Sequence, residues 1–316
     1  MTDTYGDVTA EYMAIRNEAA VVDIGRSLLW VTGPDAVEYL DGILSQDIAA
    51  MVAGSVARSL LLAPQGKLRA LLWLLRGESE VGIVADAGGV SAARTDLERF
   101  RLRVAATIGE PIPLIEVWGP MSAEVVKAAL GADPQGWWRS GTKTVVRAPV
   151  GGLDRYFISG VPTESLIEAG ALPAGNLAVT AVRIEVGEPI MGVDVDESTI
   201  PQEAHLTADS VSFTKGCYLG QELVARIDSR GRVNRFLRGL AIERNLIPPV
   251  GASITVDGGE VGSVTSVGES LELRSPIAMG MVRHEVSPGQ PVELRWDGGS
   301  VDATVEELPL DDFAMG

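Results

Sequence analysis

The stretch Lys215-Gly216-Cys217-Tyr218-Leu219-Gly220-Gln221-Glu222 places the only cysteine of the chain between two glycines. Glycines allow tight turns or a close approach to a ligand or another segment. Lys215 and the downstream Arg226 are cations, which we expect to lower the pKa of the Cys217 thiol. A lone cysteine is more often an inert buried side chain, so the residues alone leave both interpretations open.

The chain has few cysteine and histidine residues that could bind a metal ion. One cysteine excludes an intrachain disulfide, and His205 and His284 are too few to complete the usual Cys/His zinc spacings. An iron–sulfur cluster held only by the thiolates of this chain is also excluded, because such clusters normally take four. We therefore expect no resident metal.

The length and the net charge of the chain limit the classes of protein to which it can belong. A chain of 316 residues exceeds what one hydrophobic core usually organises, which predicts two or three structural units. A formal net charge of −17 disfavours nucleic acid and anionic membranes as direct partners. One basic segment stands out: Arg226, Arg230, Arg232, Arg235 and Arg238. It is either a solvated face that offsets nearby carboxylates or a site for a ligand that carries carboxylates.

The N-terminus and the apolar stretches predict a cytoplasmic protein. Residues 1–7 have neither the basic start nor the apolar core of a secretory signal. The longest apolar stretch, residues 68–75, contains Arg69 and is far shorter than the ~20 residues that cross a bilayer.

Two similar heptapeptides organise the first half: Val31-Thr32-Gly33-Pro34-Asp35-Ala36-Val37 and Val117-Trp118-Gly119-Pro120-Met121-Ser122-Ala123. In each, a strand-like run ends at Gly-Pro and a helical pattern follows, and proline suits the first turn of a helix. These junctions, with strand-like runs between them, predict two related α+β units.

The sequence changes character near residue 240. Asp257-Gly258-Gly259 and Asp297-Gly298-Gly299 each separate two runs rich in β-branched residues, which is typical of hairpins. Short strands joined by such turns predict a small β-barrel. We therefore divide the chain into an α+β region, 1–240, and a barrel, 241–316.

The cysteine segment resembles the signature of the YgfZ-type folate-binding proteins, which are relatives of the glycine-cleavage T-protein, an aminomethyltransferase. In that signature Lys-Gly-Cys-Tyr is followed by any residue and then Gly-Gln-Glu, and residues 215–222 match every specified position. Weaker matches are Leu44-Ser45-Gln46-Asp47, Ala63-Pro64-Gln65-Gly66-Lys67, Arg183-Ile184-Glu185, Gly187-Glu188-Pro189, Asp194, Pro201-Gln202-Glu203-Ala204 and Arg230-Gly231.

The resemblance implies an α+β fold in which two ferredoxin-like α/β units and a C-terminal β-barrel surround a central cavity for tetrahydrofolate or another reduced folate. It implies that Glu203 recognises the pterin and that Arg226 brings a cation to the cavity; a carboxylate and a guanidinium suit the donors and carboxylates of folate. A surface carboxylate and a structural ion pair are the alternatives for these two residues. Tyr218 and Gln221 join them as expected folate-binding residues, and Cys217 and Lys215 are the expected catalytic pair.

The T-protein relies on an aspartate shortly after an Asn-Ala-Gly stretch. The nearest equivalent here is Ala85-Asp86-Ala87-Gly88-Gly89, and residues 90–94 contain no carboxylate. Asp96 is a shifted candidate. The T-protein lineage also lacks the Cys-Tyr pair, so the pattern favours an accessory protein over a classical enzyme.

The resemblance therefore implies a tetrahydrofolate-binding accessory protein that supports iron–sulfur cluster assembly or repair in client enzymes, including tRNA-modifying ones. Its expected partners are reduced folate and iron–sulfur client enzymes or cluster carriers. The alternative is a folate-dependent aminomethyl or methyl transferase. A third interpretation is a thiol redox sensor that uses the fold as a scaffold.

Overall fold

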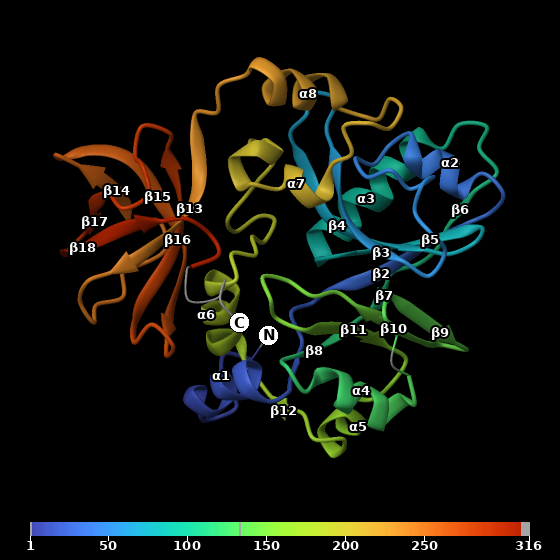
Figure 1. Ribbon diagram of the computed structural model, residues 1–316, viewed down its shortest axis with the longest axis horizontal. Helices are drawn as coiled ribbons and strands as arrows, with labels where there is room; N and C mark the ends of the chain where they lie inside the picture. The colour runs from blue at the N-terminus through green and yellow to red at the C-terminus, as the bar shows by residue number, and fades with distance from the viewer. Residues whose placement is uncertain (1, 133, 311–316) are drawn as a thin grey trace.

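The computed structural model describes residues 2–310 apart from residue 133, and the side chains of residues 229 and 230 are also outside the description. An antiparallel sheet and a mixed sheet lie on one side of the molecule and a closed barrel on the other (Figure 1). The α+β class and the C-terminal barrel are both confirmed. Among the described residues, no helix combines the length and the apolar character that crossing a bilayer requires.

The first sheet has the strand order β3-β4-β5-β2-β6, with β7 also paired to β2. Helices α2 and α3 cover one face, and their apolar side chains share a core with alternate residues of the strands, such as Leu72 and Leu74 of β4. The elements are β2 (Ser27–Thr32), α2 (Ala36–Asp41), β3 (Val56–Leu62), β4 (Leu68–Arg76), β5 (Glu80–Ala85), α3 (Ala87–Phe100), β6 (Thr107–Ile108) and β7 (Ile112–Pro113).

The second sheet has the order β12-β1-β8-β11-β10-β9, so the N-terminal strand β1 joins this sheet and not the first. Val21 of β1 packs under α4 and α5, while Ala20 and Val22 face α1 and α6 on the opposite side. The elements are α1 (Val8–Asn17), β1 (Ala20–Val22), β8 (Ile115–Trp118), α4 (Ser122–Leu130), β9 (Trp137–Ser140), β10 (Lys143–Arg147), β11 (Arg155–Ser159), α5 (Thr163–Glu168), β12 (Leu172–Pro173) and α6 (Asn176–Glu185).

The two Gly-Pro junctions serve the same geometric purpose. Gly33 and Gly119 have φ angles of 122° and 118°, and each follows a strand and precedes a helix. A Cβ on Gly33 would lie 2.4 Å from the carbonyl oxygen of Ala105, and one on Gly119 would lie 2.5 Å from that of Glu18. Each glycine therefore lets its strand-to-helix turn pass against another backbone segment.

A linker of residues 186–234 runs from α6 across the first sheet to the barrel (Figure 1). It contains the short helices η1 (Pro201–Ala204) and α7 (Thr207–Ser210) and the longer α8 (Gln221–Arg230). Tyr218 and Val224 share a core with Leu60 and Leu68 of the first sheet and with Met279 of the barrel. The linker thus packs against both.

The barrel closes in the order β13-β16-β15-β14-β17-β18. Both predicted hairpins are confirmed, because β14 pairs with β15 around residues 257–258 and β17 pairs with β18 around residues 297–298. The first strand begins at Arg235 and so spans residue 240. The strands are β13 (Arg235–Ile242), β14 (Ser253–Val256), β15 (Gly259–Ser270), β16 (Ser275–Arg283), β17 (Pro291–Trp296) and β18 (Gly299–Glu306).

Candidate functional site

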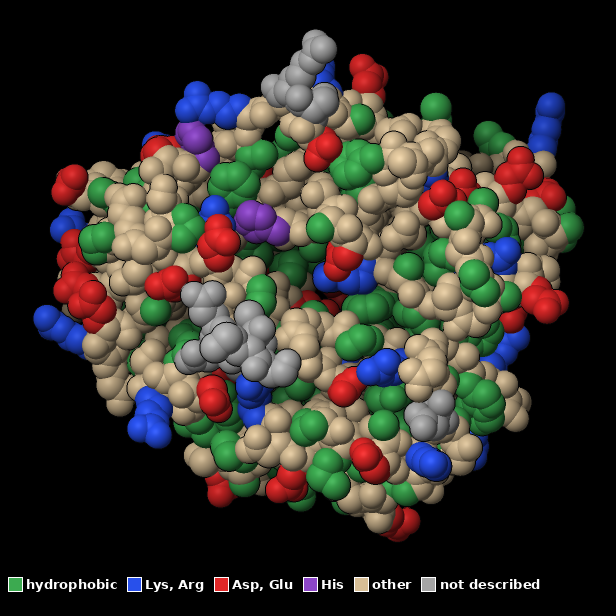
Figure 2. Space-filling view, in the orientation of Figure 1, with side chains coloured by type: hydrophobic (Ala, Val, Ile, Leu, Met, Phe, Trp, Pro, Cys, Tyr) green, Lys and Arg blue, Asp and Glu red, His purple; other side chains and the backbone are tan. Residues whose placement is uncertain are grey.

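Two adjacent cavities lie where the first sheet, the second sheet, the linker and the barrel meet. The first, of about 40 Å³, is lined by residues of the first sheet and the linker, among them Trp73 and Asp86. The second, of about 200 Å³, adds Val150 of the second unit and Leu237 of the barrel. Both share Arg58, Pro189 and Leu206. Figure 2 shows a hollow near the middle of this face, with acidic and basic side chains among hydrophobic ones.

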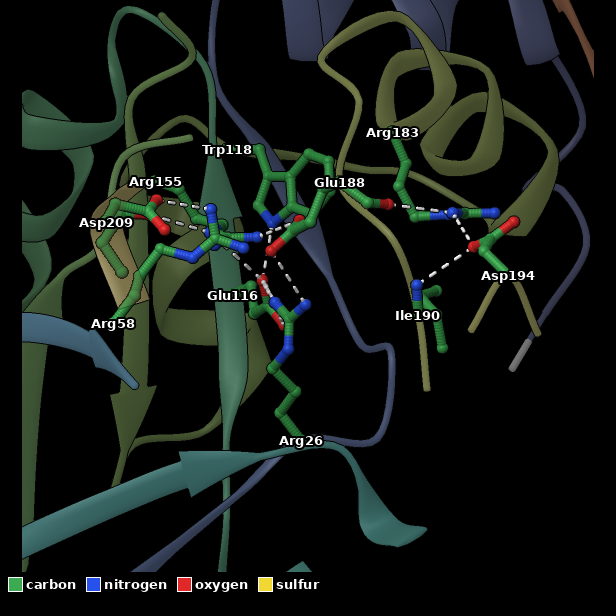
Figure 3. Close-up of polar contacts among 11 residues, drawn as sticks. Arg26, Arg58, Glu116, Trp118, Arg155, Arg183, Glu188, Ile190, Asp194 and Asp209 are labelled. Atoms are coloured by element: carbon green, nitrogen blue, oxygen red, sulfur yellow. Dashed lines mark hydrogen bonds and ion pairs between the residues drawn. The ribbon is translucent and has the colours of Figure 1, made fainter. Parts of the chain in front are cut away.

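A buried network of four charges lies beside the first cavity, and two of its members, Arg26 and Glu188, line the cavity (Figure 3). Arg26 donates from Nη1 to both carboxylate oxygens of Glu116 at 3.0 and 3.1 Å, and from Nη2 to Oε1 of Glu188 at 3.3 Å. Arg155 donates to Oε2 of Glu188 at 2.6 Å. The indole of Trp118 donates to Glu116 at 2.8 Å. Two arginines thus balance two glutamates, and their mutual attraction offsets the desolvation cost of burying them.

Aromatic rings enclose the guanidinium of Arg155, whose side chain is fully buried. Its Cζ lies 4.9 Å from the ring centroid of Phe157, 5.4 Å from that of Trp118 and 5.5 Å from that of Trp73. Such cation–π contacts gain strength when they are desolvated. Trp73 comes from the first sheet and the other two rings from the second, so Arg155 joins the two units.

Glu188 is a charge anchor and not a proton acceptor. Burial acts to raise the pKa of its carboxyl, but Arg155 and Arg26 outweigh burial and lower the pKa to about 2. Both oxygens already accept hydrogen bonds from arginines. Near neutral pH this residue therefore holds Arg26 at the wall of the cavity.

A second polar cluster fastens the linker to the barrel. Arg183 of α6 donates to Oδ2 of Asp194 at 2.6 Å (Figure 3). Its other terminal nitrogen donates to the hydroxyl of Ser266 in β15 at 2.6 Å. Arg183 also donates to the backbone carbonyl of Glu188 at 2.9 Å. These contacts fix the turn that presents the Glu188 side chain.

Lys215 is a clamp on the first unit. Its ammonium donates to the carbonyl oxygens of Asp41, Leu44 and Gln46 and to the carboxylate of Asp41, at 2.5–3.1 Å. The side chain is 1% exposed. Burial lowers its pKa, and the hydrogen bond to Asp41 opposes that shift. The ammonium is thus engaged with the last residue of α2 and the loop that follows it.

The other expected site residues of this segment differ in exposure. Cys217 is a free, exposed thiol, and Tyr218 is buried, which raises the pKa of its phenol to about 12. Gln221 begins α8, and Arg226 is exposed on the same helix. Within the described part of the chain, neither cavity is lined by any of these residues or by Lys215.

Glu203 caps the short helix η1. Its Oε2 accepts the backbone N–H of Ile200 at 3.0 Å, and its Oε1 accepts from Nε of Arg235 at 3.1 Å. The side chain is buried and lies beside the second cavity without lining it. The structure thus occupies both oxygens of the expected pterin-binding carboxylate with contacts inside the protein.

Most of the basic segment is paired with carboxylates or rings. Arg235 contacts Glu203, Arg238 lies 3.5 Å from Glu307, and the Cζ of Arg238 is 4.9 Å from the ring centroid of Phe236. Arg232 contacts His284. These contacts fit the interpretation of a face that offsets carboxylates; the side chain of Arg230 lies outside the described residues.

The candidate Asp96 and the nearby Asp86 occupy different places. Asp96 of α3 accepts from Nε of Arg69 at 3.0 Å, Arg69 also binds Glu197, and none of the three lines either cavity. Asp86, between β5 and α3, lines the first cavity. Asp86 was not among the site residues predicted from the sequence, although its place after a strand and before a helix is a signal visible there.

The comparisons with known proteins agree with this architecture. A family model described as the GCVT N-terminal domain matches residues 2–147, and one described as the glycine cleavage T-protein C-terminal barrel domain matches residues 235–312. The crystal structure of glycine cleavage system aminomethyltransferase T from Bartonella henselae superposes with a TM-score of 0.84 and 26% identity, covering 97% of this chain and 90% of that chain.

Relatives of similar length are also named aminomethyltransferase. An aminomethyltransferase of Nostoc sp. is 25% identical and one of Moorella thermoacetica is 28% identical; each match covers 97% of this chain, with 88% and 90% of the relative. The fold therefore has the plan of the aminomethyltransferases. This chain is a relative of the glycine cleavage T-protein.

Proposed function

We propose that this chain binds a reduced folate in the two cavities and uses it in aminomethyl or methyl transfer. The observation that carries the proposal is the match to aminomethyltransferases over 97% of the chain, combined with cavities where all parts of the fold meet. We further propose that the two α+β units are ferredoxin-like, that the first two units form the domain 1–240, and that these units and the barrel surround the folate cavity.

The residues that line the cavities fit such a ligand. Trp73 and Leu72 offer apolar surface for a flat ring system, Asp86 offers an acceptor for ring N–H groups, and Arg58 offers a cation for carboxylates. When bound, the reduced folate would supply amine nitrogens that carry the one-carbon unit. The protein would orient it and exclude water.

Binding requires a side chain to move. Cavities of about 40 and 200 Å³ are smaller than the ~300–1,000 Å³ typical of sites for drug-sized ligands. Arg58 lines both, and one ion pair of 2.9 Å to the half-exposed Asp209 holds its guanidinium beside the Trp73 ring. Rotation of Arg58 would merge the two cavities.

A second candidate function is supported by Cys217. The signature match to YgfZ-type proteins favours an accessory role in iron–sulfur cluster assembly or repair, with client enzymes or cluster carriers as partners. Cys217 is exposed and lies two residues after the buried Lys215 clamp. Because the thiol lies outside the residues that line the cavities, it would act on a partner protein and not on the folate.

One experiment on purified protein separates these functions. Tetrahydrofolate at ~100 times its dissociation constant should stabilise the protein by ~2.7 kcal/mol and raise the melting temperature. With a lipoyl-bound aminomethyl donor, the same protein should convert tetrahydrofolate to methylene-tetrahydrofolate and release ammonia and the free lipoyl thiol. With a secondary N-methyl amine, it should form methyl-tetrahydrofolate and release the demethylated amine. If the protein binds tetrahydrofolate but transfers no one-carbon unit, the accessory function is favoured. If it binds no reduced folate at all, both the transferase and the accessory function are refuted.

A further inference from the structure

A third cavity, of about 380 Å³, lies where α1, α6 and the barrel meet. The two helices lie side by side next to the barrel (Figure 1). Among the described residues, none that lines this cavity also lines either of the two cavities of the candidate site. Its volume falls within the ~300–1,000 Å³ typical of small-molecule sites, which often form between structural units.

Small residues leave the space for this cavity. Ala178 and Ala181 of α6 line it and are buried. Where β15 passes α6, a Cβ on Gly268 would lie 2.9 Å from the Cα of Ala181. The barrel and the helix therefore touch at this point, and both residues of the contact belong to the cavity wall.

The rest of the wall is mostly apolar. Val8 of α1, Leu177 of α6 and Ile247 of the loop after β13 line the cavity, yet they are 37%, 50% and 49% exposed. Tyr12 is buried, and its hydroxyl donates to Oε1 of Glu185 at 2.5 Å. Its single O–H donor is thus used inside the protein. A ligand in this cavity would cover apolar side chains from three separate elements.

Glu269 of β15 gives the cavity its charge. Among the described residues, it is the only Asp, Glu, Lys, Arg or His that lines the cavity, and it is exposed. In the same part of the chain, no Lys, Arg or His nitrogen lies within 4 Å of its carboxylate. Thr9 adds a hydroxyl to the wall. The wall therefore complements a cation and repels an anion.

We propose that this cavity binds an amphipathic amine, a molecule that joins a protonated amine to an alkyl or ring body. The body packs against Val8, Leu177 and Ile247, and the ammonium pairs with Glu269. Alkylamines, like the lysine side chain, are protonated near neutral pH. The inference does not depend on the proposed function, because the site shares no described lining residue with the other two cavities.

The test uses decylamine as the probe and decanoate, which has the same chain length and the opposite charge, for comparison. Calorimetry on the whole protein, below the concentration at which either probe forms micelles, measures both dissociation constants. Wild type should bind decylamine about 10-fold more tightly, because one probe gains an exposed ion pair and the other meets repulsion. Added salt should reduce this preference. Decylamine should also raise the melting temperature, since it binds the folded state.

Glu269→Gln should lose most of the preference for the amine. Glu272→Gln is the matched control, because Glu272 belongs to the same segment but does not line the cavity, and it should keep the preference. Equal affinities of wild type for the amine and the carboxylate would overturn the inference. Unchanged preference in Glu269→Gln would overturn it as well, as would failure of wild type to bind decylamine.

A second pair of variants tests the location. Leu177→Asn should weaken decylamine binding about 5-fold, because it removes part of the apolar wall. Ile167→Asn of α5 changes a side chain that is 41% exposed and lines none of the three cavities, so its affinity should equal that of wild type. A Leu177→Asn protein that binds decylamine as wild type does would refute this location. Light scattering that shows a dimer of wild type, and a monomer of Leu177→Asn, would instead assign the cavity to a second copy of the chain and overturn the inference.

Discussion

Arg155 in β11 and Glu188 in the linker form a buried ion pair of 2.6 Å that ties the second sheet to the wall of the first cavity. Arg26 joins the same carboxylate from the segment before β2. Three segments that are distant in sequence therefore depend on one glutamate for their relative position.

Glu188→Gln should destabilise the protein by about 3–5 kcal/mol, because it leaves two buried arginines with one carboxylate between them. Denaturant unfolding followed by fluorescence measures this loss. Glu110→Gln is the control, because Glu110 pairs with Arg94 on the exposed surface, and it should leave the unfolding midpoint unchanged. Equal effects of the two substitutions would mean that the buried network contributes no more than a surface pair.

Low pH should reduce the free energy of unfolding of the wild-type protein, because Glu188 becomes protonated. The pKa of Glu188 falls from an ordinary value of 4.5 to about 2 in the folded state. A depressed carboxyl pKa adds stability that is complete above the unfolded value and is lost as pH falls toward the folded one. Between pH 4.5 and 2 wild type should therefore lose more stability than Glu188→Gln. Parallel curves over this range would contradict the assignment of Glu188 as a buried anion.

Lys215→Met should destabilise the protein by about 2 kcal/mol or more, because the carbonyls that the ammonium satisfies would lose a charged donor. Folate affinity should change little, since Lys215 lines neither cavity. Unfolding and calorimetry on the same sample separate the two effects. A variant that is as stable as wild type but fails in transfer or in client repair would support the catalytic role that was predicted for Lys215 from the sequence.

Gly220→Ala should destabilise strongly, whereas Gly216→Ala should not. Gly220 has a φ angle of 81°, and a Cβ there would lie 2.6 Å from the carbonyl oxygen of Ala63 in the β3–β4 turn. A Cβ on Gly216 meets nothing within 4 Å. The expected difference is about 1–3 kcal/mol, the usual cost of a strained backbone position. Thermal melts of both variants decide whether the second glycine of the signature is there for packing.

Periodicity and turn chemistry predicted the barrel hairpins and the Gly-Pro junctions, because both depend on neighbouring residues. The pairing of β1 with β8 could not be predicted this way, since it joins residues about 95 positions apart through contacts that leave no local pattern. The same holds for Lys215: charge and spacing to Cys217 suggested thiol activation, but the carbonyls that hold it come from residues 41–46. Asp86 was visible in sequence, yet only the fold shows that it lines a cavity.

Cys217→Ser should separate the accessory function from folding and from folate binding. The thiol is exposed and the substitution keeps its size, so stability should change by no more than ~1 kcal/mol. Folate affinity should equal that of wild type, because the cavities are lined by other residues. If the accessory function is correct, cells that carry only the serine variant should show iron–sulfur enzyme activity near that of cells lacking the protein. Ser212→Ala, which removes a hydroxyl from the same segment, serves as the control and should restore client activity. Full restoration by the serine variant would leave Cys217 without a chemical role and would favour the transferase.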